Sequence, residues 1–239
     1  MDTSSQIVCK GCQQPGNGTY CSQCGESLQM KRISLSNLFH EVIHFFTHLD
    51  KGIGHTLSQL FLRPGHMQRE YIDGRRKNHQ KPFSFFFLSA TVTGLSLYWI
   101  NILLKDFYGA GNMKESAFFH QYMMFLLVLS LPYFTLVTWL FFYKAGYNFA
   151  EIGVLLLYTM SIFFLMVIFS NCTKFLFPSF QTRIIERPLI LGYAVITNIN
   201  FFQKEVRWKV IVKSLIAAFI FFKTVTFTQD WIVERYFNV

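Results

Sequence analysis

Residues 83–104 read FSFFFLSATVTGLSLYWINILL, a run of 22 positions without one ionisable side chain. An α-helix rises 1.5 Å per residue, so about 20 apolar residues are enough to cross the hydrocarbon core of a bilayer. Tyr98 and Trp99 stand near the far end of the run, where aromatic side chains commonly meet the membrane interface. The run therefore predicts a transmembrane helix.

Four further apolar runs follow along the chain. The predicted spans lie at residues 83–104, 120–143, 150–171, 188–203 and 209–228. The fourth run is only 16 residues long and carries Asn198 and Asn200, so four spans are the alternative to five. We expect an all-α polytopic membrane protein with about five transmembrane helices, preceded by a small cysteine-rich module.

Charged residues are distributed unevenly along the chain. Only 15% of all residues are charged and 52% are hydrophobic, whereas a typical soluble domain has about 25% charged residues. Residues 1–82 hold 16 of the 35 charged side chains. This composition excludes an ordinary soluble protein and predicts three parts: a ribbon at 1–30, an interfacial segment at 31–82 and a helical bundle at 83–239.

The placement of Lys and Arg predicts the orientation in the membrane. With five spans and a cytoplasmic N-terminus, the cytoplasmic segments hold 15 Lys or Arg and the outer segments hold 6. This excess obeys the positive-inside rule. If the fourth run did not span, residues 204–213 would move outside and the excess would nearly vanish. We therefore expect five spans, with the N-terminus inside and the C-terminus outside.

Four of the five cysteines form two knuckles, Cys9-Lys-Gly-Cys12 and Cys21-Ser-Gln-Cys24. Two Cys-x-x-Cys pairs this close together are typical of a structural zinc site, in which four thiolates bind one tetrahedral ion. A rubredoxin-like iron site uses the same ligands, and a redox dithiol is the other alternative. The first six residues contain neither a basic nor an apolar run, so we expect no secretory signal and a reducing compartment. The sequence thus predicts structural zinc as the cofactor.

Residues 34–62 carry apolar side chains at helical spacing, with charges and histidines between them. The pattern predicts an amphipathic helix on the membrane surface or against the bundle, broken near Gly52 and Gly54 and ended by Pro64-Gly65. Residues 66–81 are predicted to form a charged loop. We expect its basic cluster to face anionic lipid head groups, at about 1 kcal/mol for each cation. The cluster comprises Arg75, Arg76, Lys77 and Lys81.

One motif suggests an enzyme. His40-Glu41-Val-Ile-His44 fits the H-E-x-x-H pattern, in which two histidines bind zinc and the glutamate is a general base. His48 lies about 12 Å further along the same helix face, too far to share the ion with His40. Six of the seven histidines lie between residues 40 and 79, so the segment is rich in histidine generally. A membrane metalloprotease is the third hypothesis, and the sequence shows no other catalytic arrangement.

Lys223 lies inside the fifth predicted span. An ionisable side chain there indicates a functional residue when it faces the interior of a bundle, and Glu151, Asn198 and Asn200 are candidate partners. This arrangement would suit a small transporter or channel component. Lys223 is also about five residues from the outer end of its helix, so its ammonium group can reach the interface. The favoured interpretation is that the ammonium group of Lys223 reaches the membrane interface.

Several segments of the chain together resemble the bacterial family named domain of unknown function 3667. The segments are the two knuckles with Gly25, His48-Leu-Asp50-Lys-Gly52 leading to Thr56-Leu57, Leu62-Arg-Pro64-Gly65, Tyr71-Ile-Asp-Gly74-Arg75-Arg76-Lys77, Pro82, and Tyr147-Asn148-Phe149-Ala150-Glu151. The resemblance covers nearly the whole chain. It implies a protein of the bacterial inner membrane with a zinc-binding N-terminus and no established activity. One departure is Gln13, which follows the first knuckle where such ribbons often have glycine.

These observations favour a membrane-anchored scaffold or adaptor. A zinc ribbon of this size is too small to hold a substrate and needs its metal to fold, so we expect it to recognise a protein partner. A small transporter is the alternative, but the spans carry few polar groups and show no evident inverted repeat. Nucleic acid is not an expected partner, because only Lys10 accompanies the knuckles before residue 31.

Overall fold

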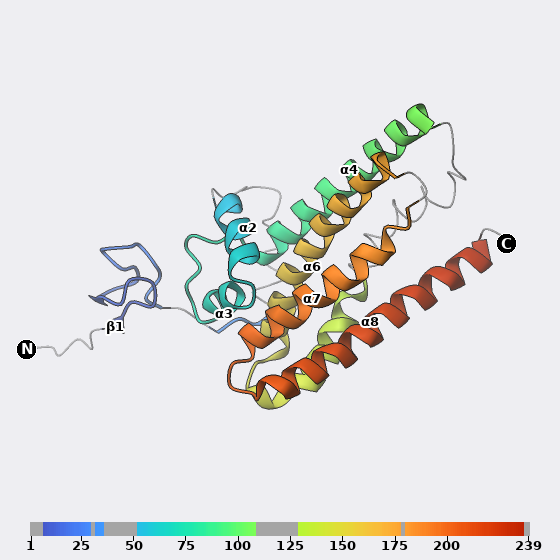
Figure 1. Ribbon diagram of the computed structural model, residues 1–239. Coiled ribbons are helices and arrows are strands. Elements are labelled where there is room, and N and C mark those ends of the chain that lie inside the picture. Colours follow the sequence, from blue (N-terminus) through green and yellow to red (C-terminus); the bar gives the residue numbers. More distant parts are fainter. Residues whose placement is uncertain (1–6, 30–31, 36–51, 109–128, 178–179, 237–239) are drawn as a thin grey trace, which may run out of the picture.

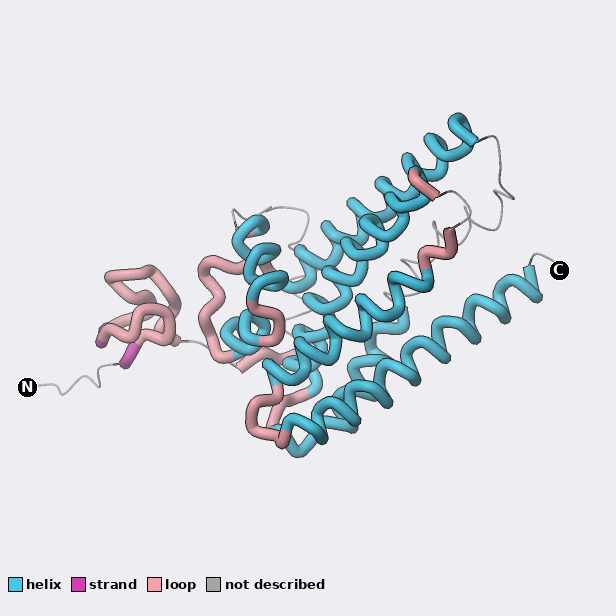
Figure 2. Tube along the Cα trace, viewed as in Figure 1, coloured by secondary structure: helices cyan, strands magenta, loops and turns pink. Residues whose placement is uncertain are grey.

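The computed structural model describes residues 7–29, 32–35, 52–108, 129–177 and 180–236. Helices make up most of the described chain, and a small ribbon of short strands and turns, residues 7–29, lies beyond one end of them (Figures 1 and 2). The elements are β1 (Ile7–Val8), β2 (Pro15–Gly16), α2 (Ile53–Leu62), α3 (His66–Ile72), α4 (Pro82–Tyr108), η1 (Tyr143–Ala145), α6 (Phe149–Cys172), η2 (Thr173–Phe175), α7 (Arg183–Phe201) and α8 (Arg207–Tyr236). Residues 129–142 are also helical.

The central helix of the bundle is α6. Of its 24 residues, 14 are buried, and it packs against both α4 and α7. The helices α7 and α8 form an antiparallel pair beside it (Figure 1). Tyr158 and Ile162 lie in the largest core cluster and are fully buried. An almost wholly apolar sequence is what a helix surrounded on several sides requires.

Within the described residues, three helices are long and apolar enough to cross a membrane: Pro82–Tyr108, Phe149–Phe175 and Arg207–Ile232. They coincide with the first, third and fifth predicted spans, so these helices form where they were predicted, and their length and composition indicate membrane association. Large apolar side chains such as Phe219 and Phe227 are exposed on α8, as lipid-facing residues are. The second predicted span is described only from residue 129 onward. The fourth overlaps α7, which ends at Phe201 and is not among the three, so the five-span arrangement and its orientation stay predictions.

Residues 66–81 differ from the predicted loop. Their first seven residues form α3, and Met67, Gln68, Tyr71 and Ile72 in this helix are buried. The many charges of the segment concealed this pattern, because Arg69 and Glu70 occupy the opposite side of a helix only two turns long. The end of α2 (Ile53–Leu62) before Pro64 is as predicted, and the helix begins directly after Gly52, but Gly54 lies within it and does not break it. The predicted helix between residues 36 and 51 falls outside the described residues.

The α2–α3 turn is held against the end of α7. Asn200 donates a hydrogen bond to the carbonyl of Pro64 at 2.8 Å, and Tyr193 donates to the carbonyl of Leu60 at 3.1 Å. Gly65 has a φ of +83°, and a Cβ atom there would lie 2.2 Å from the carbonyl oxygen of Thr197. Only glycine allows the two backbones to approach this closely. We call this end of the bundle, where α2 and α3 pack and where α4, α6 and α8 begin, the polar end.

Replacing Gly65 with Ala should destabilise the protein by more than about 2 kcal/mol, because the positive φ and the backbone clash both oppose a side chain. Thermal unfolding of the purified chain in detergent measures the effect as a lower midpoint. Gly54→Ala is the matched control, since a Cβ at Gly54 meets nothing within 4 Å and alanine favours a helix. Equal midpoints for the two variants would contradict the proposed contact with α7.

Candidate metal centre

Each knuckle of the ribbon is the turn of a very small antiparallel hairpin. The first joins β1 and β2, and the second lies between Tyr20 and Ser27, which form an isolated bridge. The turns are closed in the same way, because Gln13 N–H donates to Cys9 O at 2.9 Å and Gly25 N–H donates to Cys21 O at 2.8 Å. The two equivalent turns place their cysteines face to face.

The four knuckle cysteines form one cluster. Their sulfur atoms all lie within 4.8 Å of one another, with 3.5 Å between Cys9 and Cys24 and 3.6 Å between Cys12 and Cys21. Four ligands at about 2.3 Å around a tetrahedral ion would be about 3.8 Å apart, so the observed spacing fits such a site. All four are free thiols rather than disulfides, and Cys9 is fully buried. These residues could hold a metal ion.

The backbone of the second knuckle favours a thiolate. Hydrogen bonds from the backbone of Cys24 and of Gln23 lower the pKa of Cys21 to about 6. At Cys12 the backbone of Gln14 acts in the same direction, but burial and the other thiols outweigh it and raise the pKa to about 12. Four thiolates so close together repel one another, and a divalent cation removes that repulsion. The cluster thus has the electrostatics of a metal site.

The two turns differ in one residue. Gly25 has a φ of +69°, which glycine adopts freely, whereas Gln13 holds the equivalent position with a φ of +63°. Gln13 is the one residue other than glycine with a positive φ in the described chain. The departure noted from sequence is therefore a site of backbone strain, and it leaves the ligand set intact.

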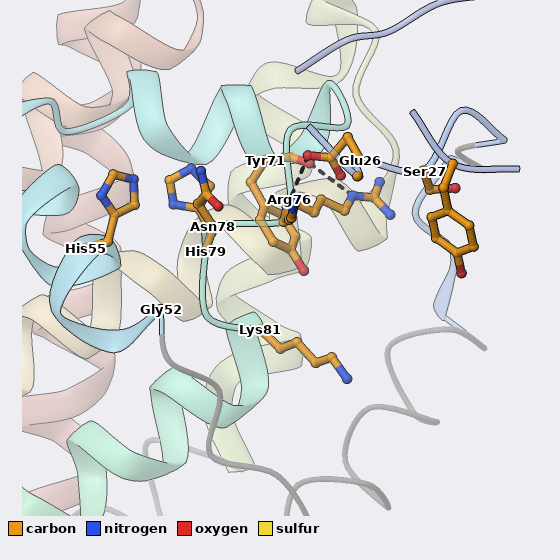
Figure 3. A pocket seen from close by; sticks show the side chains of 12 residues that line it. Glu26, Ser27, Gly52, His55, Tyr71, Arg76, Asn78, His79 and Lys81 are labelled. Atoms are coloured by element: carbon orange, nitrogen blue, oxygen red, sulfur yellow. Dashed lines mark hydrogen bonds between the residues drawn. The ribbon is translucent and has the colours of Figure 1, made fainter. Parts of the chain in front are cut away.

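Lys77 holds the second knuckle on the polar end. Its ammonium group donates to the carbonyl of Cys24, and its backbone N–H donates to the carboxylate of Glu26 at 3.2 Å. Gly25 makes room for this contact, because a Cβ there would lie 2.8 Å from the Lys77 nitrogen. Glu26 and Arg76 both line the cleft drawn in Figure 3. The metal cluster and the loop before α4 are therefore in direct contact.

Glu151 anchors the connector that follows the ribbon. This carboxylate is 3% exposed and accepts two hydrogen bonds from Arg32, at 2.7 and 2.9 Å. Asn148 caps α6 by accepting from the Glu151 N–H at 2.8 Å, and its amide group donates to the carbonyl of Ile33 at 3.0 Å. One turn of the central helix therefore binds two successive residues of the connector.

A cleft of about 710 Å³ separates the second knuckle from α2, and Figure 3 shows its lining. His55 and His79 lie with their ring centroids 5.2 Å apart. Burial, followed by the nearby His55, lowers the pKa of His79 to about 4, so this imidazole is neutral at pH 7. Neutral imidazole can bind metal, but in the described chain only the four cysteines form a group of three or more ligands close together.

Of the remaining predicted catalytic and intramembrane residues, the structure describes Lys223 but not the H-E-x-x-H motif. His40, Glu41 and His44 fall outside the described residues. Lys223 is exposed on α8, 5.8 Å from the ring centre of Phe219. Its three suggested partners bond elsewhere: Glu151 to Arg32, Asn198 to Ser214 and Asn200 to Pro64.

The predicted lipid-facing cluster is divided by the fold. Lys77 contacts the ribbon, and Arg76 donates to the carbonyl of Tyr71 at 3.1 Å. Arg75 lies 3.7 Å from Glu70, and Lys81 extends away from the two histidines in Figure 3. Contact of these four residues with lipid stays a prediction.

Sequence reasoning did not identify Arg32, Glu26 or the role of Lys77. Asn148 and Glu151 were identifiable as a capping box, because an N-cap residue followed three positions later by glutamate begins many helices. No local signal joins Arg32 to Glu151, which are 119 residues apart.

Comparison with known proteins supports the resemblance over one segment. Residues 50–94 match the family model described as Protein of unknown function (DUF3667). This segment contains α2, α3, the loop that carries Lys77 and the first half of α4. No curated protein and no solved structure matches the chain.

The chain should bind one divalent metal ion through the four knuckle cysteines. Cobalt titration of the purified protein should produce thiolate-to-metal absorption at one ion per chain, and lowering the pH should remove it, because protons compete for the thiolates. Cys21→Ser should abolish this binding. Cys172→Ser is the matched control, since Cys172 lies outside the cluster. Full binding by Cys21→Ser, or loss of binding by Cys172→Ser, would contradict this assignment.

Proposed function

We propose that this protein is a membrane-anchored zinc-ribbon adaptor of the bacterial inner membrane, with the ribbon in the cytoplasm and a protein partner bound to it. Zinc is the metal that best suits four thiolates in a closed tetrahedral site, and a bound ion would fold the ribbon without taking part in catalysis. The positive-inside count and the free thiols support a cytoplasmic location.

The observation that carries the proposal is the attachment of the ribbon to the polar end. Lys77 holds the knuckle and Arg32 holds the connector, so the ribbon has a defined position on the bundle. The ribbon nevertheless exposes apolar side chains, with Tyr20 at 67% and Val8 at 58% exposure. A fixed module with exposed aromatic and aliphatic side chains suits recognition of a protein.

The adaptor proposal predicts that partner binding requires the metal. Affinity purification from membranes in mild detergent should recover the same partners with the wild-type chain and with Cys172→Ser. The double variant Cys21→Ser, Cys24→Ser should lose them while inserting into the membrane to the same level. Recovery of an unchanged set of partners by this double variant would overturn the proposal.

The proposed orientation predicts which side of the membrane exposes Cys172. This thiol is exposed at the end of α6 opposite the ribbon, so it lies on the outer side when the N-terminus is inside. A membrane-impermeant maleimide added to intact cells should label wild type at Cys172 and leave Cys172→Ser unlabelled. Labelling of wild type only after the cells are opened would show the opposite orientation.

A further inference from the structure

A second cleft, of about 390 Å³, lies between the first knuckle and the polar end. We call it the basic cleft, because five of its lining side chains are cationic and two are carboxylates. The cations come from four separate segments, namely the first knuckle, the connector, α3 with the loop after it, and the α7–α8 loop. They are Lys10, Arg32, Arg69, Arg76 and Lys204.

Each of the two carboxylates of the basic cleft is paired with an arginine. Glu151 accepts both hydrogen bonds from Arg32, and Asp73 lies 3.8 Å from Arg69. The ammonium groups of Lys10 and Lys204 form no hydrogen bond or ion pair with any residue that the structure describes, although the backbone carbonyl of Lys10 accepts a hydrogen bond from Gln13. The net charge of the side chains that line the cleft is therefore +3, and the two lysines without an acidic partner come from two separate segments, the first knuckle and the α7–α8 loop.

This arrangement is suited to a small, multiply charged anion. Cations gathered in a concave site raise the local potential and attract a counter-ion. Arginine offers a planar set of donors and lysine a compact point charge, and both bind phosphate oxygens well. A volume of about 390 Å³ suits a head group or a small molecule rather than a polymer. The cleft also lies where α6 and α8 begin, at the level where lipid phosphates would lie around a spanning bundle.

Lys10 links this cleft to the metal centre. It lies between Cys9 and Cys12, so its position depends on the turn that the metal would close. We propose that the basic cleft binds a phosphate group, and that metal in the ribbon completes the site by placing Lys10. The coupling rests on the proposed zinc ribbon, and it must be reciprocal, so that phosphate binding strengthens metal binding by the same factor.

The test uses the full-length, metal-loaded chain in neutral detergent micelles at low ionic strength. Two probes are titrated separately, pyrophosphate and phosphatidylglycerol, to distinguish a soluble phosphate compound from a lipid head group. Lys10→Ala and Lys204→Ala should each weaken binding of the effective probe about tenfold, as expected for loss of a charge-assisted contact. Lys10→Arg should retain binding.

The matched control is Lys105→Ala, because Lys105 is an exposed lysine near the end of α4 away from the ribbon. Metal content and the unfolding midpoint verify that each variant is folded. The site is supported if one probe binds and both Lys10→Ala and Lys204→Ala weaken its binding. The probe that binds then shows whether the phosphate belongs to a soluble compound or to a lipid head group. Equal affinities for wild type, Lys10→Ala, Lys204→Ala and Lys105→Ala would overturn it.

The metal coupling has its own measurement. The double variant Cys21→Ser, Cys24→Ser should bind the effective probe several-fold more weakly than wild type, and adding Lys10→Ala to it should cause no further loss. Unchanged affinity in the metal-free variant would overturn the coupling. Failure of partner recovery does not affect this experiment, so the adaptor proposal and the phosphate proposal fail independently.

Discussion

The buried carboxylate of Glu151 is the constraint on which the arrangement of the polar end depends. A buried charge is costly unless it is paired and fully hydrogen-bonded. Arg32 supplies the pair, and the backbone N–H of Asn148 supplies a further hydrogen bond at 2.9 Å. Because Glu151 lies in the first turn of the central helix, satisfying it fixes the connector against α6. The ribbon, which directly precedes the connector, is thereby brought to the same end of the bundle.

The segment that matches the family model supplies the second attachment. Gly65 allows the α2–α3 turn to lie against the backbone of α7, which positions α3 and the loop after it. The backbone N–H of Gln80 donates a hydrogen bond to the hydroxyl of Thr56 at 2.7 Å, and the hydroxyl of Tyr158 donates to the carbonyl of Gln80 at 2.5 Å. These two hydrogen bonds fix the loop before α4, and the loop places Lys77 against the second knuckle. The described part of this segment, residues 52–94, thus forms the structural link between ribbon and bundle.

The sequence was informative where one local property determines the structure. Uninterrupted apolar length identified the helices at 83–104, 150–171 and 209–228, and the spacing of four cysteines identified the cluster. Glycine and proline marked the ends of α2. The sequence was not informative where a long-range contact decides, as for Arg32 with Glu151 and Lys77 with Cys24. The sequence also did not reveal α3. A helix of seven residues is too short for its buried side chains to show a helical repeat, and charged residues lie between them. For Lys223, the sequence left two interpretations open, a partner inside the bundle and the favoured position at the interface, and the structure exposes the side chain on α8.

The central claim is that the metal-bound ribbon is docked on the loop before α4. Hydrogen exchange of the backbone amides at residues 74–80 in the full-length protein tests it most directly, because the N–H of Lys77 bonds to Glu26 of the ribbon. The amide of Lys77 should be protected in the metal-loaded wild type and should exchange faster in the Cys21→Ser, Cys24→Ser variant, while amides within α6 stay unchanged. Equal protection of this loop with and without the metal site would contradict the docking.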